Sequence, residues 1–141
     1  MKSILILLCL FSNMANSQTK GIGDLVTGLQ DMAFWDYSRV KIELISKQIP
    51  FEENVFNSNQ KAISVSQDHY QIRFTFIDEK QLRSTIRFTV DQGGNDIKEV
   101  YYAFLGIYPQ NAYGQWIKKL GMLTVYTTYS EKINGFIIST E

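Results

Sequence analysis

The sequence predicts an α+β domain in which helices pack on one face of an antiparallel meander sheet. Two observations support this prediction. Segments 70–76 and 82–90 alternate apolar and polar residues, as strands with one buried face do. The first segment after residue 17 instead spaces its apolar residues along one helical stripe.

Residues 1–17 have the organisation of a secretory signal peptide. Lys2 precedes a run of about nine mostly apolar residues, and Ala15 and Ser17 place small side chains where a signal peptidase reads. The run is shorter than the roughly 20 residues that a membrane-spanning helix needs. Cleavage is therefore expected between Ser17 and Gln18, leaving one domain, 18–141.

A lipid anchor on Cys9 is disfavoured, because large residues, Leu7 and Leu8, precede it. Cys9 is the only cysteine, so the mature domain would contain no disulfide. Losing Lys2 from 14 basic and 14 acidic residues leaves a formal net charge of about −1, which gives no general electrostatic basis for binding nucleic acid. We expect a periplasmic or secreted protein of a bacterial envelope.

The first mature segment is expected to be a helix, because apolar residues follow one stripe: Ile22, Leu25, Val26, Leu29, Met32 and Ala33. Residues 36–49 fit a helix or a strand, since Val40, Ile42 and Leu44 also alternate with charged residues. We favour a helix through about Lys47, which Pro50 ends. Residues 50–60 are expected to form a loop.

Strands are expected at 63–65, 70–76, 82–90 and 97–105, with a break at 66–69 and turns at 78–81 and 92–96. Inward positions of the meander are expected to be Tyr70, Ile72, Phe74, Phe76, Leu82, Ile86, Phe88 and Val90. A second helix is expected over 109–120, with Pro109 in its first turn and Gly121 as its cap. Strands 123–130 and 136–140, joined at Asn134-Gly135, would form a C-terminal hairpin.

This order of elements resembles small curved-sheet α+β domains such as the cystatin-like and nuclear-transport-factor-like folds. The resemblance concerns architecture and does not determine function.

The outer face of the predicted meander carries the candidate binding residues. They are Arg73, Arg83, Arg87, Glu99 and Tyr101. In register, Arg73 would lie near Thr85 or Arg87, and such a cluster of like charges favours an acidic partner. One interpretation is a solvated face with Glu99 as that partner. The other is a shallow site for an anion or an acidic partner, since guanidinium forks match carboxylates and phosphates.

Catalytic and metal-binding signals are weak. His69, the only histidine, lies in a turn-like stretch beside Asp68, and adjacency in sequence does not make a catalytic dyad. No catalytic residue, metal site or cofactor is assigned. The sequence therefore favours an exported, non-enzymatic binding domain for a protein or a small molecule. The alternatives are an inhibitor or immunity-type protein and a small hydrolase or isomerase with a sheet-lined pocket.

Cleavage after Ser17 is directly testable. When the precursor is expressed in a bacterium with an intact export pathway, intact-mass spectrometry of the exported chain should show a protein that begins at Gln18. Recovery of the protein only as the uncleaved precursor in the cytoplasm would contradict the expected export.

Overall fold

The computed structural model describes residues 18–67, 69–88 and 109–140. Two helices precede seven strands in this part of the chain. The elements are α2 (Gln18–Asp31), α3 (Tyr37–Ser46), β1 (Glu52–Val55), β2 (Gln60–Ser66), β3 (Tyr70–Ile77), β4 (Lys80–Phe88), β5 (Trp116–Leu120), β6 (Leu123–Ser130) and β7 (Gly135–Thr140).

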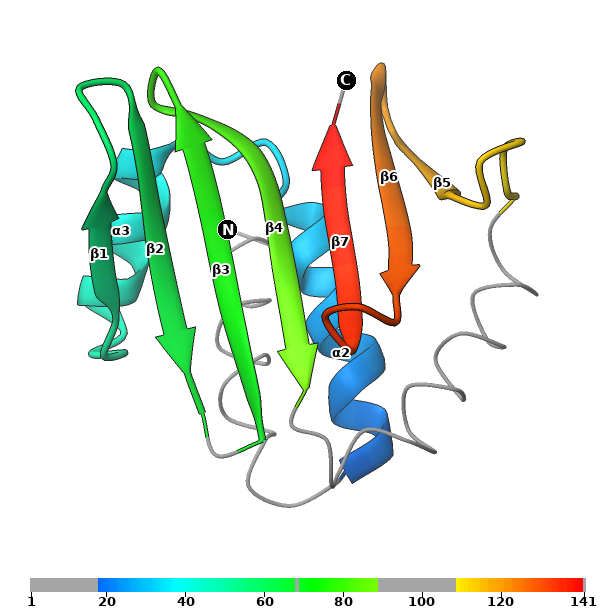
Figure 1. The fold of residues 1–141 in the computed structure, drawn as a ribbon, viewed down its shortest axis with the longest axis horizontal. Helices are drawn as coiled ribbons and strands as arrows, with labels where there is room; N and C mark the ends of the chain where they lie inside the picture. Colours follow the sequence, from blue (N-terminus) through cyan, green and yellow to red (C-terminus); the bar gives the residue numbers. More distant parts are fainter. Residues whose placement is uncertain (1–17, 68, 89–108, 141) are drawn as a thin grey trace.

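The seven strands form one antiparallel sheet in the order β1-β2-β3-β4-β7-β6-β5. Both helices lie behind this sheet in Figure 1, α2 behind β4 and β7 and α3 behind β1 and β2. The predicted fold class, α+β with helices on one face of an antiparallel meander, is thereby confirmed. Neither helix of the described part is long and apolar enough to cross a membrane.

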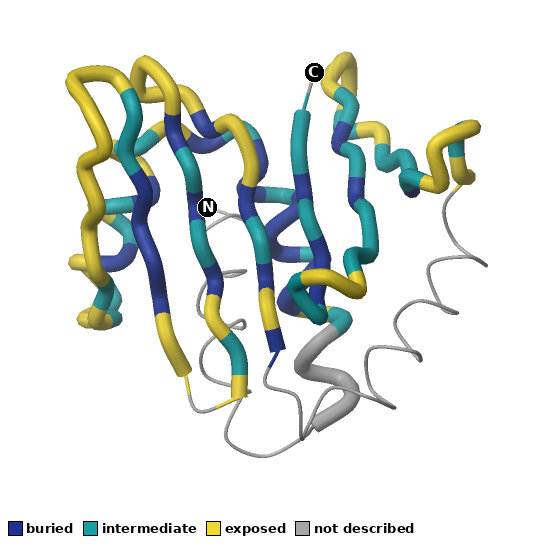
Figure 2. Tube along the Cα trace, viewed as in Figure 1, coloured by how far each residue is buried: buried dark blue, intermediate teal, exposed yellow. Residues whose placement is uncertain are grey.

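The core lies between the helices and the face of the sheet that they cover. In α2, Leu25, Val26 and Leu29 are at most 2% exposed, as the predicted helical stripe requires. They join one buried cluster with residues of the central strands, among them Phe136 and Ile138. Figure 2 shows buried stretches in the middle of these strands and exposed residues at the tips of the hairpins.

The segment that was ambiguous in sequence forms a separate helix, α3. The continuous helix expected through Lys47 is interrupted at residues 32–36, between α2 and α3. Asp36 is extended and its carboxylate accepts a hydrogen bond from the backbone N–H of Arg39 at 2.8 Å, as an N-cap does. The new helix can therefore turn away from α2 and still bury Val40 and Leu44.

Two predicted elements differ from the structure. Residues 52–55, expected as loop, form edge strand β1, which pairs with β2. Residues 109–120, expected as helix, contain a turn at 112–114 followed by strand β5. The amide side chain of Asn111 caps this turn by accepting hydrogen bonds from two backbone N–H groups. Pairing of β5 with β6 then buries Trp116. Hairpin pairing with the following strand therefore outweighs the helix that the apolar spacing indicated.

The inward positions predicted for the meander are mostly correct. Ile72, Phe74, Phe76, Ile86 and Phe88 are buried and Tyr70 is half-buried. The inward position predicted for Leu82 is wrong, since this residue is 46% exposed. The register shifts between Thr75 and Phe76, so that Leu82 is the extra residue of a β-bulge and Gln81 and Ser84 point inward instead.

Several predictions fall outside the described residues. These are the signal peptide, the end of the strand at Val90, the turn at 92–96 and the strand at 97–105.

The backbone of β7 approaches that of β4 closely at Gly135, and this approach is testable. A Cβ on Gly135 would collide with the backbone carbonyl of Ile86. We expect Gly135→Ala to lower the free energy of unfolding by more than about 2 kcal/mol, because a backbone clash forces the central strands apart. Urea unfolding followed by circular dichroism measures the change.

Gly23→Ala is the matched control. A Cβ at Gly23, within α2, meets nothing within 4 Å. Alanine should therefore raise stability by about 0.5–1 kcal/mol through helix propensity. Equal effects of the two substitutions would contradict the close approach of β7 to β4.

Candidate functional site on the open face of the sheet

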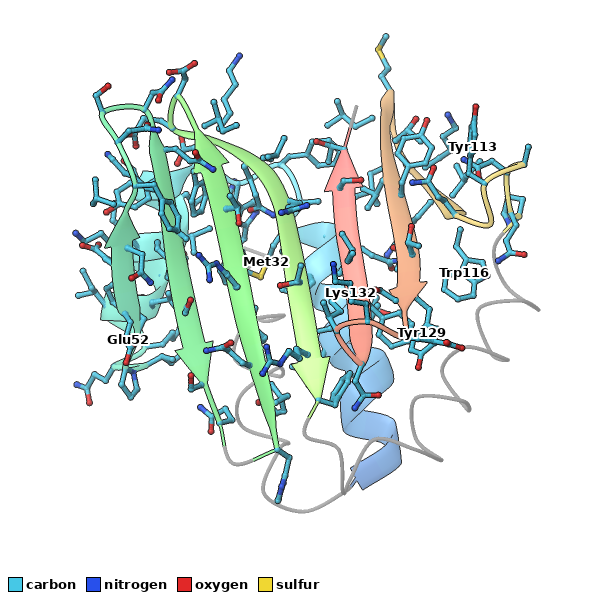
Figure 3. The ribbon with its side chains drawn as sticks, viewed as in Figure 1. Met32, Glu52, Tyr113, Trp116, Tyr129 and Lys132 are labelled. Carbon is cyan, nitrogen blue, oxygen red and sulfur yellow. The ribbon has the colours of Figure 1, made fainter. Side chains whose placement is uncertain are left out.

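The face of the sheet that points away from α2 and α3 is called here the open face. Alternation along each strand determines which residues lie on it. In Figure 3, side chains project from β2, β3 and β4 toward the viewer, on the side opposite the two helices. The strand register places these residues on the open face: Glu52, Asn54, Ala62, Ser64, Gln71, Arg73, Thr75, Arg83, Thr85, Arg87, Tyr126, Thr128, Gly135, Ile137 and Ser139.

The three predicted arginines occupy neighbouring positions on this face. Gln71 pairs with Arg87, Arg73 with Thr85, and Thr75 with Arg83. Of the two neighbours expected for Arg73, Thr85 or Arg87, the register pairs it with Thr85. Each arginine thus faces a neutral residue on the partner strand, and the arginines are diagonal to one another, which limits repulsion between like charges.

The flanking strands add only small neutral neighbours to each arginine. Ser64 lies beside Arg73 on β2. On β7, Ser139 lies beside Arg83 and Gly135 beside Arg87. No salt bridge joins the three guanidinium groups to any carboxylate within residues 18–67, 69–88 and 109–140. The strand neighbours of the three arginines are therefore neutral, and the charged groups nearest in the fold are Glu131 and Lys132, which line a depression together with Arg87.

Cations on the helix side of the sheet are arranged differently. Lys41 binds Glu53 at 2.6 Å and Lys61 binds Glu79 at 2.6 Å. Hydrogen bonds from Lys41 and from the Tyr37 hydroxyl hold the pKa of Glu53 below its usual value. Two cations beside α3, Lys41 and Lys61, thus have carboxylate partners, whereas Arg39 of the same helix lies over the ring of Trp35 instead.

One depression on the open face lies around Phe56 and is called the Phe56 depression. It measures about 380 Å³ and is lined by Phe56, Gln60, Arg73, Thr75, Arg83 and Thr85. The guanidinium carbon of Arg73 lies 5.4 Å from the centre of the Phe56 ring, a distance typical of a cation–π contact. This contact holds the Arg73 side chain over β2 and β3.

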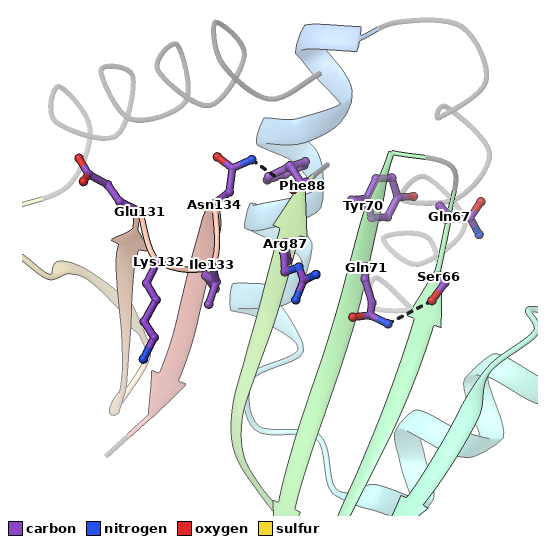
Figure 4. Close-up of a pocket in the computed structure, with 10 residues that line it drawn as sticks. All are labelled: Ser66, Gln67, Tyr70, Gln71, Arg87, Phe88, Glu131, Lys132, Ile133 and Asn134. Atoms are coloured by element: carbon purple, nitrogen blue, oxygen red, sulfur yellow. Dashed lines mark hydrogen bonds between the residues drawn. The ribbon is translucent and has the colours of Figure 1, made fainter. Parts of the chain in front are cut away.

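Another depression, called the Tyr70 depression, lies at the opposite end of β3 and β4. It measures about 750 Å³, and Figure 4 shows the residues that line it: Ser66, Gln67, Tyr70, Gln71, Arg87, Phe88, Glu131, Lys132, Ile133 and Asn134. The Asn134 amide donates to the Phe88 carbonyl at 3.1 Å and fixes the β6–β7 turn against β4. Burial raises the pKa of Tyr70 to about 12.

The structure places some predicted site residues and leaves others undescribed. It brings Arg73, Arg83 and Arg87 together, while Glu99 and Tyr101 lie outside the described residues. His69 is exposed between β2 and β3, and no hydrogen bond links it to another residue of the described ranges. The same ranges contain no group of three His, Cys, Asp or Glu side chains suited to a metal ion.

Sequence reasoning missed Phe56 and the turn residue Lys132 as site components. Phe56 falls in the loop expected over 50–60, whereas the β1–β2 hairpin brings it beside Arg73. The available signal was an aromatic residue next to a polar turn, Asn57 to Asn59, between two segments that pair as strands.

Comparison with protein-family models, with curated proteins and with solved structures finds no match for this chain.

The raised pKa of Tyr70 yields a prediction about alkaline stability. Because the folded pKa, about 12, exceeds the usual tyrosine pKa of 10.0, the contribution of Tyr70 to stability is fully present below pH 10 and is lost as the pH rises toward 12. Tyr70→Phe should therefore lose less stability than the unsubstituted protein between pH 10 and pH 12.

Urea unfolding at several alkaline pH values measures this difference, and absorbance at about 295 nm reports phenolate formation. Tyr113→Phe is the control, since Tyr113 is 86% exposed. Equal pH dependence of the two variants would contradict a buried Tyr70 hydroxyl.

Proposed function

We propose that this chain is an exported, non-enzymatic binding domain of the bacterial envelope or the extracellular medium, and that it binds an anionic ligand on its open face. The observation that carries the proposal is the set of three arginines with neutral neighbours and no salt bridge within the described residues. Guanidinium groups bind carboxylates and phosphates through paired, charge-assisted hydrogen bonds.

The environment of the arginines supports a binding role. Arg83 and Arg87 are exposed and Arg73 is half-buried against Phe56, so the groups are accessible and one of them is oriented by packing. The Phe56 depression contains two of the three arginines, and the Tyr70 depression contains the third. Hydroxyl groups of Thr75 and Thr85 lie between the cations and supply neutral hydrogen-bonding groups.

The hydrolase or isomerase alternative would need a base close to a nucleophile. The exposed position of His69 offers no support for it within the described part of the chain. An inhibitor or immunity-type protein would use the same face toward a protein partner.

Titration with citrate, a small tricarboxylate, tests the proposed function. In two-dimensional ¹H–¹⁵N NMR spectra, citrate should shift the backbone and guanidinium signals of Arg73, Arg83 and Arg87 and of their neighbours. Combined substitution of these three arginines by glutamine should abolish the shifts, and raising ionic strength from about 0.01 M to about 0.15 M should weaken them by screening.

Lys47→Gln is the matched control, since it also removes a positive charge but lies at the end of α3 on the helix side. It should leave citrate binding unchanged. Citrate shifts that persist in the triple variant, or shifts spread evenly over the protein, would contradict binding at the open face.

A further inference from the structure

The three arginines form a regular ladder along β3 and β4. The three paired positions 71/87, 73/85 and 75/83 follow one another at intervals of two residues. Each of these positions carries one arginine, which lies on β4, then on β3, then on β4 again. We call Arg87, Arg73 and Arg83, in this order, the arginine ladder.

The ladder has a definite repeat. Two residues of a strand advance by about 6.6 Å, so the Cα positions of the first and third steps are separated by about 13 Å along the strands. A single small anion contacts only part of such a row, whereas an extended polypeptide advances by the same distance for every two of its own residues. Alternate side chains of an extended peptide also point to the same side.

From this match, and as a refinement of the proposed function on which it rests, we infer that the open face binds an extended acidic peptide with a carboxylate at every second residue. The peptide would lie along β3 and β4, with successive carboxylates on Arg87, Arg73 and Arg83. Guanidinium–carboxylate pairing supplies the affinity, and the two-residue repeat supplies the selectivity.

The surroundings of the ladder fit a peptide along its whole length. The Phe56 depression lies at the Arg83 end of the ladder and the Tyr70 depression at the Arg87 end, so the ladder runs from one depression to the other. In the Tyr70 depression, Gln67 and Gln71 provide amides on the β2 and β3 side of Arg87, and the β6–β7 turn provides Lys132 together with Glu131 on the other side (Figure 4). Amide and hydroxyl side chains can bond to the backbone groups of a peptide.

A peptide accounts for the observations better than a nucleic acid does. The chain has equal numbers of basic and acidic residues, whereas nucleic-acid binding depends on a surplus of cations along the phosphate backbone. Binding of single-stranded nucleic acid also relies on aromatic side chains as stacking platforms for successive bases. Of the aromatic rings that line the two depressions, Phe56 already contacts the guanidinium of Arg73, Phe88 is buried and Tyr70 is half-buried.

Two labelled peptides of identical composition test the inference. Both carry three glutamates and two serines between terminal glycines. In one the glutamates alternate with the serines, and in the other the glutamates are contiguous. Net charge is equal, but the extended alternating peptide presents three carboxylates to one side and the contiguous peptide presents two. Fluorescence anisotropy should show roughly tenfold tighter binding of the alternating peptide, the effect of one additional charge-assisted contact.

Single substitutions then test each step of the ladder. Arg73→Gln, Arg83→Gln and Arg87→Gln should each weaken binding of the alternating peptide by roughly tenfold, because each removes one guanidinium–carboxylate contact. Lys47→Gln should leave the affinity unchanged. Circular dichroism spectra of the variants should match that of the unsubstituted protein, since Arg83 and Arg87 are exposed.

The outcomes separate the two proposals. Equal affinity for the alternating and contiguous peptides would overturn the ladder inference, as would tighter binding of a thymidine hexanucleotide or an oligogalacturonate than of the alternating peptide. If citrate binds the open face while neither peptide does, the inference fails and the proposed function stands. If neither citrate nor either peptide binds there, both fail.

Discussion

Burial of only one face of the sheet is the constraint on which the rest of this structure depends. The helices α2 and α3 cover a single face, so each central strand must present apolar residues at every second position and polar residues between them. Leu25, Val26 and Leu29 of α2 cluster with Phe136 and Ile138 of β7 and leave little exposed apolar surface between the layers. If cleavage removes Cys9, this core has to stabilise the domain without a disulfide. The open face is under no such packing demand, and its composition therefore reflects solubility or binding.

Register connects the core to the candidate site. Gly135 allows β7 to approach β4 closely, and the same glycine leaves the β7 side of Arg87 without a side chain. The bulge at Leu82 lies just beyond the pair formed by Thr75 and Arg83, so the three arginines occupy a regular part of the ladder between β3 and β4. Two local features of the backbone thus lie at the two ends of the row of arginines. One permits close packing beside its first arginine, and the other ends the regular pairing immediately after its last.

Local patterns predicted the parts of the fold that depend on local chemistry. Alternation identified β3, β4 and β6, and the stripe of apolar residues identified α2, because in both cases the buried residues recur at a fixed period in the sequence. The turn signal at Asn134-Gly135 indicated β7. The helix expected over 109–120 is wrong because Trp116, Ile117 and Leu120 also fit a helical stripe. Hairpin pairing with the following strand, β6, makes this part of the segment a strand. For the site, alternation placed the arginines on one face of the sheet. Their spacing along the sheet depends on the register between β3 and β4. The sequence allowed either Thr85 or Arg87 as the neighbour of Arg73 and so did not determine this register.

The electrostatic arrangement of the open face is the remaining argument that the arginines serve a partner. Solubility alone is satisfied by mixed charges, and the helix side of this protein shows such pairs, with Lys41 beside Glu53 and Lys61 beside Glu79. On the open face, Glu52 of β1 is separated from Arg73 by Ser64 of β2, a distance of about 10 Å across two strand spacings. Three like charges on adjacent strands repel one another, and the diagonal placement reduces that repulsion without neutralising it. A partner that brings carboxylates to all three would relieve the repulsion as it binds, so the gain on binding is largest for the ligand whose charges follow the same repeat.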